Sequence, residues 1–209
     1  MKALALLFAL SLYLLPNPIH STRNPIRLPT AASGGIPVVD DHGLPLLPGT
    51  PYILRSWNWT HGGLRLVSLD GATTQCPSDV VISSDLDEIG IPVMFTPADP
   101  NAPVVFEWTP QNIKFDIPTT RLCVNNVSWE AQYDPKSAQR FVKAGDVLSH
   151  NFQIESVAPT LHAYNITYCE SGADNCYPVG THYGPGQQLR LALSTDQPYC
   201  ISFMKARFA

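Results

Sequence analysis

Positive charge is scarce in this 209-residue chain, which has 13 Lys and Arg against 17 Asp and Glu and a formal net charge of −4. The basic residues form no cluster, and none lies between Arg65 and Lys114. Proteins that bind nucleic acid or anionic membranes concentrate Lys and Arg on one surface. The composition therefore argues against both as partners.

Long apolar runs are also scarce, because the only one lies at the amino terminus. Lys2 precedes a mostly apolar run over residues 3–15, which polar residues and two prolines follow. A run this short is typical of a secretory signal peptide rather than a membrane span. We expect a signal peptide over residues 1–21, cleaved near Ser21 without an Ala-x-Ala motif, and no membrane association after its removal.

Motifs that carry catalysis, cofactors or metals are absent from the sequence. No Gly-x-Ser-x-Gly, His-Glu-x-x-His or glycine-rich phosphate loop occurs. The acidic segment 85–88 lacks EF-hand spacing and is interpreted as a solvated turn. We therefore expect no enzyme, no cofactor and no metal site. The six histidines are scattered along the chain: His20, His42, His61, His150, His162 and His182.

Proline, by contrast, is abundant: 20 residues interrupt nearly every segment long enough for a helix. Only residues 136–143 could form even a short helix. Short apolar stretches alternate with turn signals, a pattern typical of a β-sandwich or barrel. The prediction is an all-β fold of about twelve short strands. They include residues 52–57, 64–67, 79–83, 129–132, 152–155, 163–168, 189–193 and 199–203.

The segment between Cys76 and Cys123 is predicted to contain a proline-rich loop at 97–103 and two alternating strands joined by a turn at 109–112. Each strand presents three apolar residues on one face: Val104, Phe106 and Trp108, then Ile113, Phe115 and Ile117. The four tryptophans, Trp57, Trp59, Trp108 and Trp129, are interpreted as core and rim packing rather than as a sugar-binding platform.

Five cysteines remain after the signal peptide: Cys76, Cys123, Cys169, Cys176 and Cys200. In a secreted chain pairing is the default, which leaves an odd one. Zinc binding is the competing interpretation, but the spacing of Cys169 and Cys176 does not match the usual short knuckle. The sequons Asn58-Trp-Thr, Asn126-Val-Ser and Asn165-Ile-Thr are glycosylation candidates and agree with passage through the secretory pathway.

Short motifs recur along the whole mature chain: Val39-Asp40, Gly43-x-Pro45-Leu46, Gly49-x-x-Tyr52-Ile53, Gly62-Gly63-Leu64, Cys76-Pro77, Ile113-x-Phe115, Leu122-Cys123, Tyr168-Cys169 and Arg190-Leu191-Ala192-Leu193. Together they resemble the pattern of the plant Kunitz (soybean-type) inhibitor family. The resemblance implies a β-trefoil over residues 33–209, disulfides Cys76–Cys123 and Cys169–Cys176, and an unpaired Cys200 where the family usually has an aliphatic residue. The first bridge would stabilise the fold by roughly 4 kcal/mol on a chain-entropy estimate.

The segment after the signal peptide resembles the vacuolar sorting propeptide of tuberous-root storage proteins in this family. Its sorting motif is Asn24-Pro25-Ile26-Arg27, within a propeptide expected over residues 22–32. On composition alone the segment would be a linker, because it has little to bury. The resemblance instead implies delivery to the vacuole through the secretory pathway.

For the family's inhibitors, the resemblance implies a rigid loop that a serine protease binds as an uncleavable substrate. The equivalent loop here is 96–103, with Pro97, Ala98, Asp99, Pro100 and Asn101 as candidate reactive residues. Family trypsin inhibitors place Arg or Lys near Asp99, Pro100 or Asn101, and burying an aspartate against trypsin's anionic pocket would cost several kcal/mol.

The asparagine that braces this loop in the family is also missing, since Leu47-Pro48 takes its place. Lys136 and Arg140, near Pro135, are the alternative contacts for trypsin. The expected function is a vacuolar Kunitz-type serine protease inhibitor and storage protein with a non-basic reactive loop, acting on plant, insect or microbial proteases. The alternative is a storage protein without significant inhibition.

Overall fold

The computed structural model describes residues 35–69, 77–118, 126–170, 175–193 and 198–207. The signal peptide, the propeptide and their predicted boundaries lie outside these residues. In the described part no helix is long and apolar enough to cross a membrane. Its elements are β1 (Pro51–Ser56), β2 (Leu64–Val67), β3 (Asp79–Ile82), β4 (Val93–Pro97), β5 (Gln111–Phe115), β6 (Ser128–Asp134), β7 (Gln139–Gly145), β8 (Phe152–Ala158), η2 (Pro159–Leu161), β9 (Ala163–Cys169), β10 (Cys176–Tyr183), η3 (Pro185–Gln187), β11 (Leu189–Leu193) and β12 (Ile201–Lys205).

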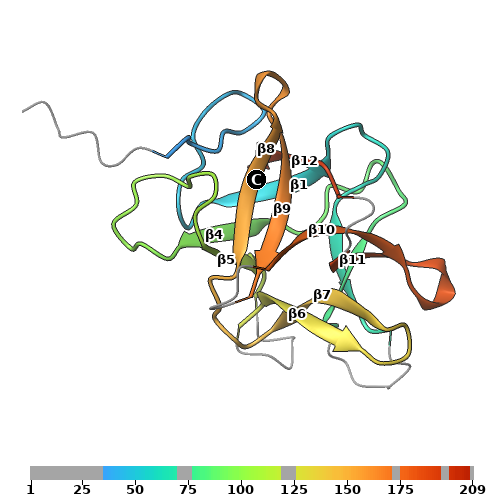
Figure 1. The fold of residues 1–209 in the computed structure, drawn as a ribbon. Coiled ribbons are helices and arrows are strands. Elements are labelled where there is room, and N and C mark those ends of the chain that lie inside the picture. The colour runs from blue at the N-terminus through green and yellow to red at the C-terminus, as the bar shows by residue number, and fades with distance from the viewer. Residues whose placement is uncertain (1–34, 70–76, 119–125, 171–174, 194–197, 208–209) are drawn as a thin grey trace, which may run out of the picture. The chain divides into compact units, whose positions relative to one another are not determined.

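Six of the strands close into a ring through antiparallel pairing. β1 pairs with β4 and β12, β5 pairs with β4 and β8, and β9 pairs with β8 and β12. Closure matters because it leaves none of these six strands with an open edge that could pair with another chain. The long hairpin of β8 and β9 stands beside β1 and β12 in Figure 1.

The other six strands form three hairpins, β2–β3, β6–β7 and β10–β11. The hairpins join one another through single residue pairs: Val81 with Arg190, Phe141 with Ala192, and Asp79 with Lys143. The chain thus contains three successive four-strand units, each giving two strands to the ring and one hairpin to the cap. This is a β-trefoil, so the predicted fold is confirmed.

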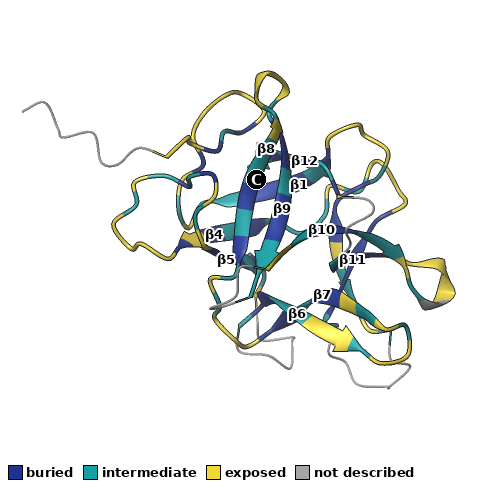
Figure 2. Cartoon of the chain, in the orientation of Figure 1, coloured by how far each residue is buried: buried dark blue, intermediate teal, exposed yellow. Residues whose placement is uncertain are grey.

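The core is built from the inward face of each strand, as period-two patterning requires. Ile113 and Phe115 are almost completely buried, which confirms the predicted face of β5. Trp129 is fully buried, and its ring meets Phe152 edge-on at 5.7 Å between centroids. Figure 2 shows buried residues along the strands and exposed ones concentrated in the connections.

The prediction of a strand over 104–108 with Val104, Phe106 and Trp108 facing the core is wrong. Val105 is the fully buried residue, and Trp108 is 55% exposed with φ of 59°. The reason is a long-range partner that local patterning cannot show. Val38 N–H donates to the Val105 carbonyl (3.0 Å), and Val105 N–H donates to the Leu46 carbonyl (2.9 Å), so this segment follows residues 36–46.

The prediction that residues 136–143 could form a short helix is also wrong, because these residues form a turn and most of β7. Asp134 closes the turn by accepting Lys136 N–H (3.0 Å) and the Ser137 hydroxyl (2.7 Å). Ala138 takes a left-handed conformation (φ 54°), which turns the chain back along β6. These side-chain bonds to the backbone compete with helix formation.

Of the four tryptophans, for which core and rim packing is predicted, Trp129 lies in the core, whereas Trp57 and Trp59 are 38% and 63% exposed. Both lie beyond the end of β1, where Trp59 has φ of 56°. The Arg55 guanidinium lies 3.8 Å from the Trp59 ring centroid, and Trp57 Nε1 donates to the Leu161 carbonyl at 3.2 Å. Stacking and this hydrogen bond hold the rings at the surface.

A buried ion-pair cluster joins the three hairpins of the cap. Asp79 in β3 is 2% exposed, and its Oδ1 lies 3.2 Å from Lys143 Nζ in β7 and 2.6 Å from Arg190 Nη2 in β11. Asp79 Oδ2 accepts Leu69 N–H at 3.1 Å. The Arg190 guanidinium lies 3.6 Å from the Phe141 ring centroid. One charged side chain from each hairpin therefore meets at a single carboxylate.

Asp79→Asn should lower the free energy of unfolding by about 3–5 kcal/mol, because it leaves two cationic side chains without their buried counter-charge. Urea denaturation at neutral pH measures this change. Asp87→Asn is the matched control, since Asp87 is exposed, and it should shift stability by less than about 0.5 kcal/mol. Equal effects of the two substitutions would contradict a structural role for the cluster.

Candidate functional site

The predicted reactive loop connects β4 to β5 and projects at the left of Figure 1. Its base is fixed by the pairing of Pro97 with Gln111 and by Ala98 N–H donating to the Pro110 carbonyl at 2.9 Å. At the carboxyl side, Val105 N–H is bonded to Leu46. Both ends of the loop are therefore anchored on the strand ring.

The tip of the loop is folded into a turn. Pro97 is buried, whereas Ala98, Asp99, Pro100 and Asn101 are exposed. Asp99 Oδ1 accepts Asn101 N–H (2.9 Å), and the Asp99 carbonyl accepts Ala102 N–H (3.1 Å). Proline at the second position favours this turn. A peptide that docks on a partner as an added strand must be extended, so the tip has to open before it can dock that way.

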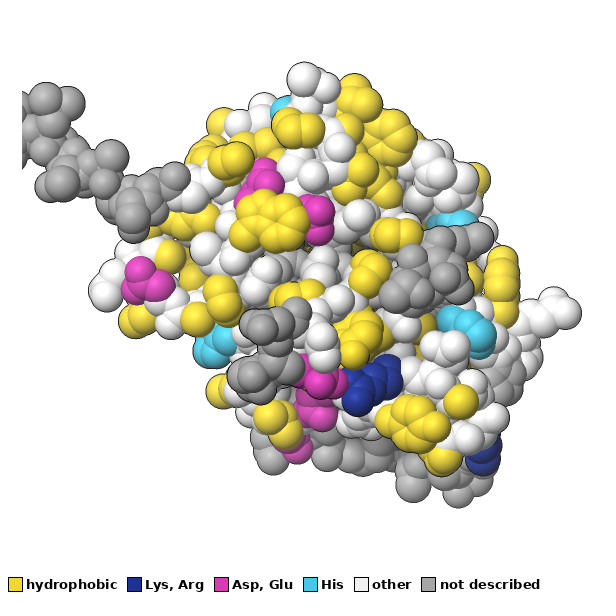
Figure 3. Space-filling model, viewed as in Figure 1, with side chains coloured by type: hydrophobic (Ala, Val, Ile, Leu, Met, Phe, Trp, Pro, Cys, Tyr) yellow, Lys and Arg dark blue, Asp and Glu magenta, His cyan; other side chains and the backbone are white. Residues whose placement is uncertain are grey.

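The charge of the loop agrees with the sequence prediction, because Asp99 is the one ionisable side chain from Ala98 to Pro103. On the face seen in Figure 3, Lys and Arg side chains are few among scattered hydrophobic and polar ones. The Leu47-Pro48 segment is held through its backbone: Leu47 N–H donates to the Tyr52 hydroxyl at 2.9 Å. Burial is the main reason why the pKa of Tyr52 is raised.

The two alternative basic residues differ in their availability. The Arg140 guanidinium forms an ion pair with the Glu170 carboxylate, and this bond raises the pKa of Arg140. Lys136 is exposed on the turn between β6 and β7 and forms no ion pair with any described residue. Of the two, Lys136 is the side chain that a partner could reach.

The cysteines agree with the expected pairing as far as the described residues extend. Cys169 and Cys176 lie opposite each other on β9 and β10 and are joined by a disulfide of 2.06 Å. Cys76 and Cys123 lie outside the described residues, so their bridge stays a prediction. Cys200 is a half-buried free thiol, and burial raises its pKa.

Cys200 should therefore react slowly with iodoacetamide at neutral pH, because a raised pKa lowers the thiolate fraction and half the side chain is shielded. Peptide mapping without reduction should recover Cys169 linked to Cys176 and Cys76 linked to Cys123. A denatured sample alkylated in urea serves as the control for full reactivity. Recovery of Cys200 in any disulfide would contradict the pairing.

The glycosylation candidates differ in exposure. Asn58 is exposed, and its Oδ1 accepts hydrogen bonds from the hydroxyls of Ser56 (2.6 Å) and Thr60 (2.8 Å). Asn126 is half-buried and its Nδ2 donates to the Asp146 carbonyl at 3.4 Å. Asn165 is half-buried within β9. Asn58 is thus the most accessible of the three.

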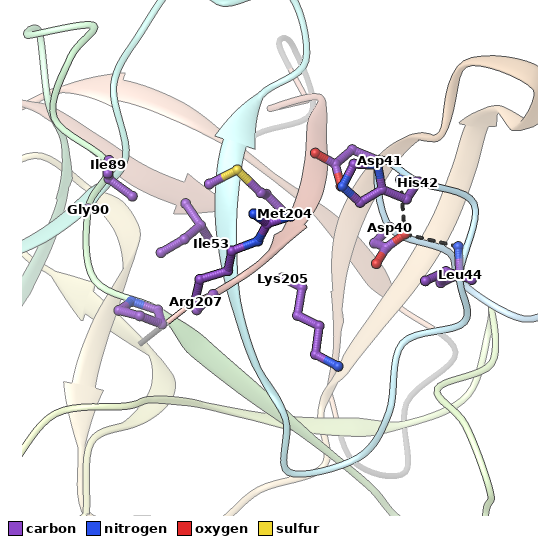
Figure 4. Close-up of a pocket in the computed structure, with 12 residues that line it drawn as sticks. Asp40, Asp41, His42, Leu44, Ile53, Ile89, Gly90, Met204, Lys205 and Arg207 are labelled. Carbon is purple, nitrogen blue, oxygen red and sulfur yellow. Dashed lines mark hydrogen bonds and ion pairs between the residues drawn. The ribbon is translucent and has the colours of Figure 1, made fainter. Parts of the chain in front are cut away.

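A concave site that the sequence did not indicate lies on another part of the trefoil. It is a pocket of about 870 Å³ between the residue 40–44 turn, the 89–92 segment and the paired strands β1 and β12 (Figure 4). Its residues come from four separated stretches of chain, and no local motif joins them. Among the described residues, including those of this pocket, no group of three or more His, Cys, Asp or Glu side chains could hold a metal ion.

A closed six-stranded ring with a three-hairpin cap defines the β-trefoil class, here with an anchored, exposed loop after β4. The family model for Kunitz-type trypsin and protease inhibitors matches residues 38–205, and the chain belongs to this family. Sporamin B of Ipomoea batatas is 51% identical over 204 residues, which cover 93% of this chain and 94% of that protein. Serine protease inhibitor 5 of Solanum tuberosum is 31% identical over 96% of this chain and 99% of its own length.

Solved structures agree with the trefoil. MP-4 from Mucuna pruriens superposes with a TM-score of 0.71 at 27% identity, covering 82% of this chain and 99% of its own. Soybean trypsin inhibitor, solved in complex with porcine pancreatic trypsin, gives a TM-score of 0.71 at 25% identity over 82% of this chain and 99% of that chain. Three of these four relatives are named as a sporamin or as inhibitors and none as an enzyme, which is consistent with the predicted lack of catalysis.

Proposed function

We propose that this protein is a vacuolar Kunitz-type protease inhibitor and storage protein whose β4–β5 loop inhibits trypsin weakly. The observation that carries the proposal is the loop itself. By resemblance it corresponds to the family's inhibitory loop. It is anchored at both ends and has an acidic and proline-rich tip without Arg or Lys. Serine proteases are the partner class, because soybean trypsin inhibitor, with the same fold, is solved bound to trypsin.

Anchoring at both ends favours inhibition, because a loop that is already ordered loses little entropy on docking. The chemistry of the tip opposes trypsin in particular. A basic side chain in a desolvated acidic pocket makes a charge-assisted contact, and hot-spot residues of this kind contribute about 4–8 kcal/mol. Asp99 and Pro100 cannot make that contact, so the loop suits proteases whose primary pocket accepts small or polar side chains.

A titration of trypsin, chymotrypsin, elastase and subtilisin tests the proposal. We expect weak inhibition of trypsin by the wild type and at least a hundredfold gain for Pro100→Arg, which supplies the missing charge-assisted contact. Pro159→Arg, at another exposed proline, is the matched control and should not change inhibition. Loss of trypsin inhibition in Lys136→Ala would assign it to the β6–β7 turn instead, and Arg140→Ala tests the ion-paired alternative.

Storage without inhibition is the second candidate, and the closed turn at Asp99 favours it. If no protease in the panel is inhibited by the wild type or by Pro100→Arg, the loop has no inhibitory role and the storage function alone remains. Nanomolar inhibition of trypsin by the wild type, abolished by trimming Asp99 and Pro100, would contradict the charge argument.

The vacuolar part of the proposal rests on Asn24-Pro25-Ile26-Arg27, which follows the predicted signal peptide directly. Changing both Ile26 and Arg27 to alanine should divert a fluorescently tagged protein from the vacuole to the cell exterior. A matched pair of alanine substitutions at Leu28 and Thr30 tests whether sorting depends on the motif itself or on the whole propeptide segment. Vacuolar delivery of the Ile26/Arg27 variant would refute sorting by this motif.

A further inference from the structure

We propose that the pocket of Figure 4 binds an aliphatic carboxylate, with an alkyl chain on its apolar floor and a carboxylate group on Arg207. This inference is independent of protease inhibition. Pro92 lines the pocket immediately before β4, whereas the inhibitory loop begins after Pro97 at the other end of the same strand. The volume of about 870 Å³ falls within the range of ligand pockets, roughly 300–1,000 Å³.

The floor of the pocket is apolar and lies outside the main core. Ile53 and Met204 are opposite each other in the β1–β12 pairing. Ile53 alternates with Tyr52 and Leu54, which belong to the core cluster, so its side chain faces away from that core. Ile53 is only 4% exposed, so the half-buried Met204 offers most of the floor that a ligand can reach.

The walls add apolar surface that the fold leaves in contact with water. Leu44 is 59% exposed on one side and Ile89 is 58% exposed on the other. A ligand that covers both removes apolar area from solvent, which is the main source of affinity in such pockets. Among the described lining residues no phenyl, phenol or indole ring occurs. The pocket therefore favours a flexible alkyl chain over a stacked aromatic ring.

The charges around the pocket favour an anion. Asp40 is buried and its Oδ1 already accepts the N–H groups of His42 (3.0 Å) and Leu44 (2.9 Å). Asp41 Oδ1 faces His42 Nε2 at 3.9 Å. Lys205 and Arg207 form no ion pair within the described part of the chain. Asp40 is thus engaged by backbone N–H groups, whereas Asp41 is paired only when His42 is protonated. Arg207 has no ion-pair partner among the described residues and is available to an anionic group.

The position of Arg207 allows one ligand to place its alkyl chain on the apolar floor and its carboxylate on the guanidinium at the same time. In Figure 4 its side chain extends alongside Ile53 and Met204, so the guanidinium stands next to the apolar floor. Guanidinium groups bind carboxylates through paired charge-assisted hydrogen bonds. An alkyl carboxylate would place its chain on the floor and its head group on Arg207, whereas the Lys205 side chain extends away from Arg207 in Figure 4.

Isothermal titration calorimetry of the purified mature protein with decanoate tests this proposal. We expect saturable binding of one decanoate, and binding of 1-decanol and of decylammonium at least about tenfold weaker, because neither head group can pair with a cation. Acetate should not bind, since it lacks the chain. Absence of saturable decanoate binding, or equal affinity for decylammonium, would overturn the proposal.

Variants separate the two halves of the site. Arg207→Gln should weaken decanoate about tenfold and leave decanol unchanged, whereas Leu44→Gln should weaken both ligands. Val147→Gln, at a valine 61% exposed in the β7–β8 connection, is the matched control and should change neither. Ile89→Gln repeats the wall test if Leu44→Gln fails to fold. Unchanged decanoate affinity in Arg207→Gln, or in the wall variants, would also overturn the assignment.

Discussion

A single buried carboxylate holds the cap of this trefoil together. Asp79 receives Lys143 and Arg190 from the other two hairpins, and only one residue pair of strand bridging joins each pair of hairpins. A buried charge is unfavourable unless it is compensated, so removal of any one hairpin would leave at least one of these side chains without its partner. The cluster therefore couples the packing of the three hairpins.

Local sequence patterns predicted many of the strands correctly. They failed for segments whose hydrogen-bonding partners are distant in the sequence. The bounds of β2 and β11 follow from alternation and turn residues alone, and the family motifs supply the trefoil. The buried face of residues 104–108 was predicted wrongly, because this segment pairs with the stretch around Val38 and Leu46. That pairing buries Val105 instead of Val104, Phe106 and Trp108. The pocket could not be predicted from the spacing of Ile53, Ile89 and Arg207 in the sequence, because only the folded chain brings these residues together.

The loop and the scaffold carry separate information about function. Anchors at Ala98 and Val105 belong to the backbone, so the tip between them can change its side chains without loss of the trefoil. This explains why the family assignment is firm while the target protease depends on a handful of exposed positions. The sequence predicted the missing positive charge correctly, but the closed turn depends on the hydrogen bonds of Asp99, which only the coordinates reveal.

The turn at Asp99 also bears on how long the protein survives. Proteases cleave segments that can be drawn out into their clefts, and a tip closed by its own hydrogen bonds, with proline at its centre, resists that deformation. This exposed tip is therefore a poor place for a first cut. If the protein serves as a reserve of amino acids, as proposed, a self-closed tip would delay its degradation whether or not any protease is inhibited.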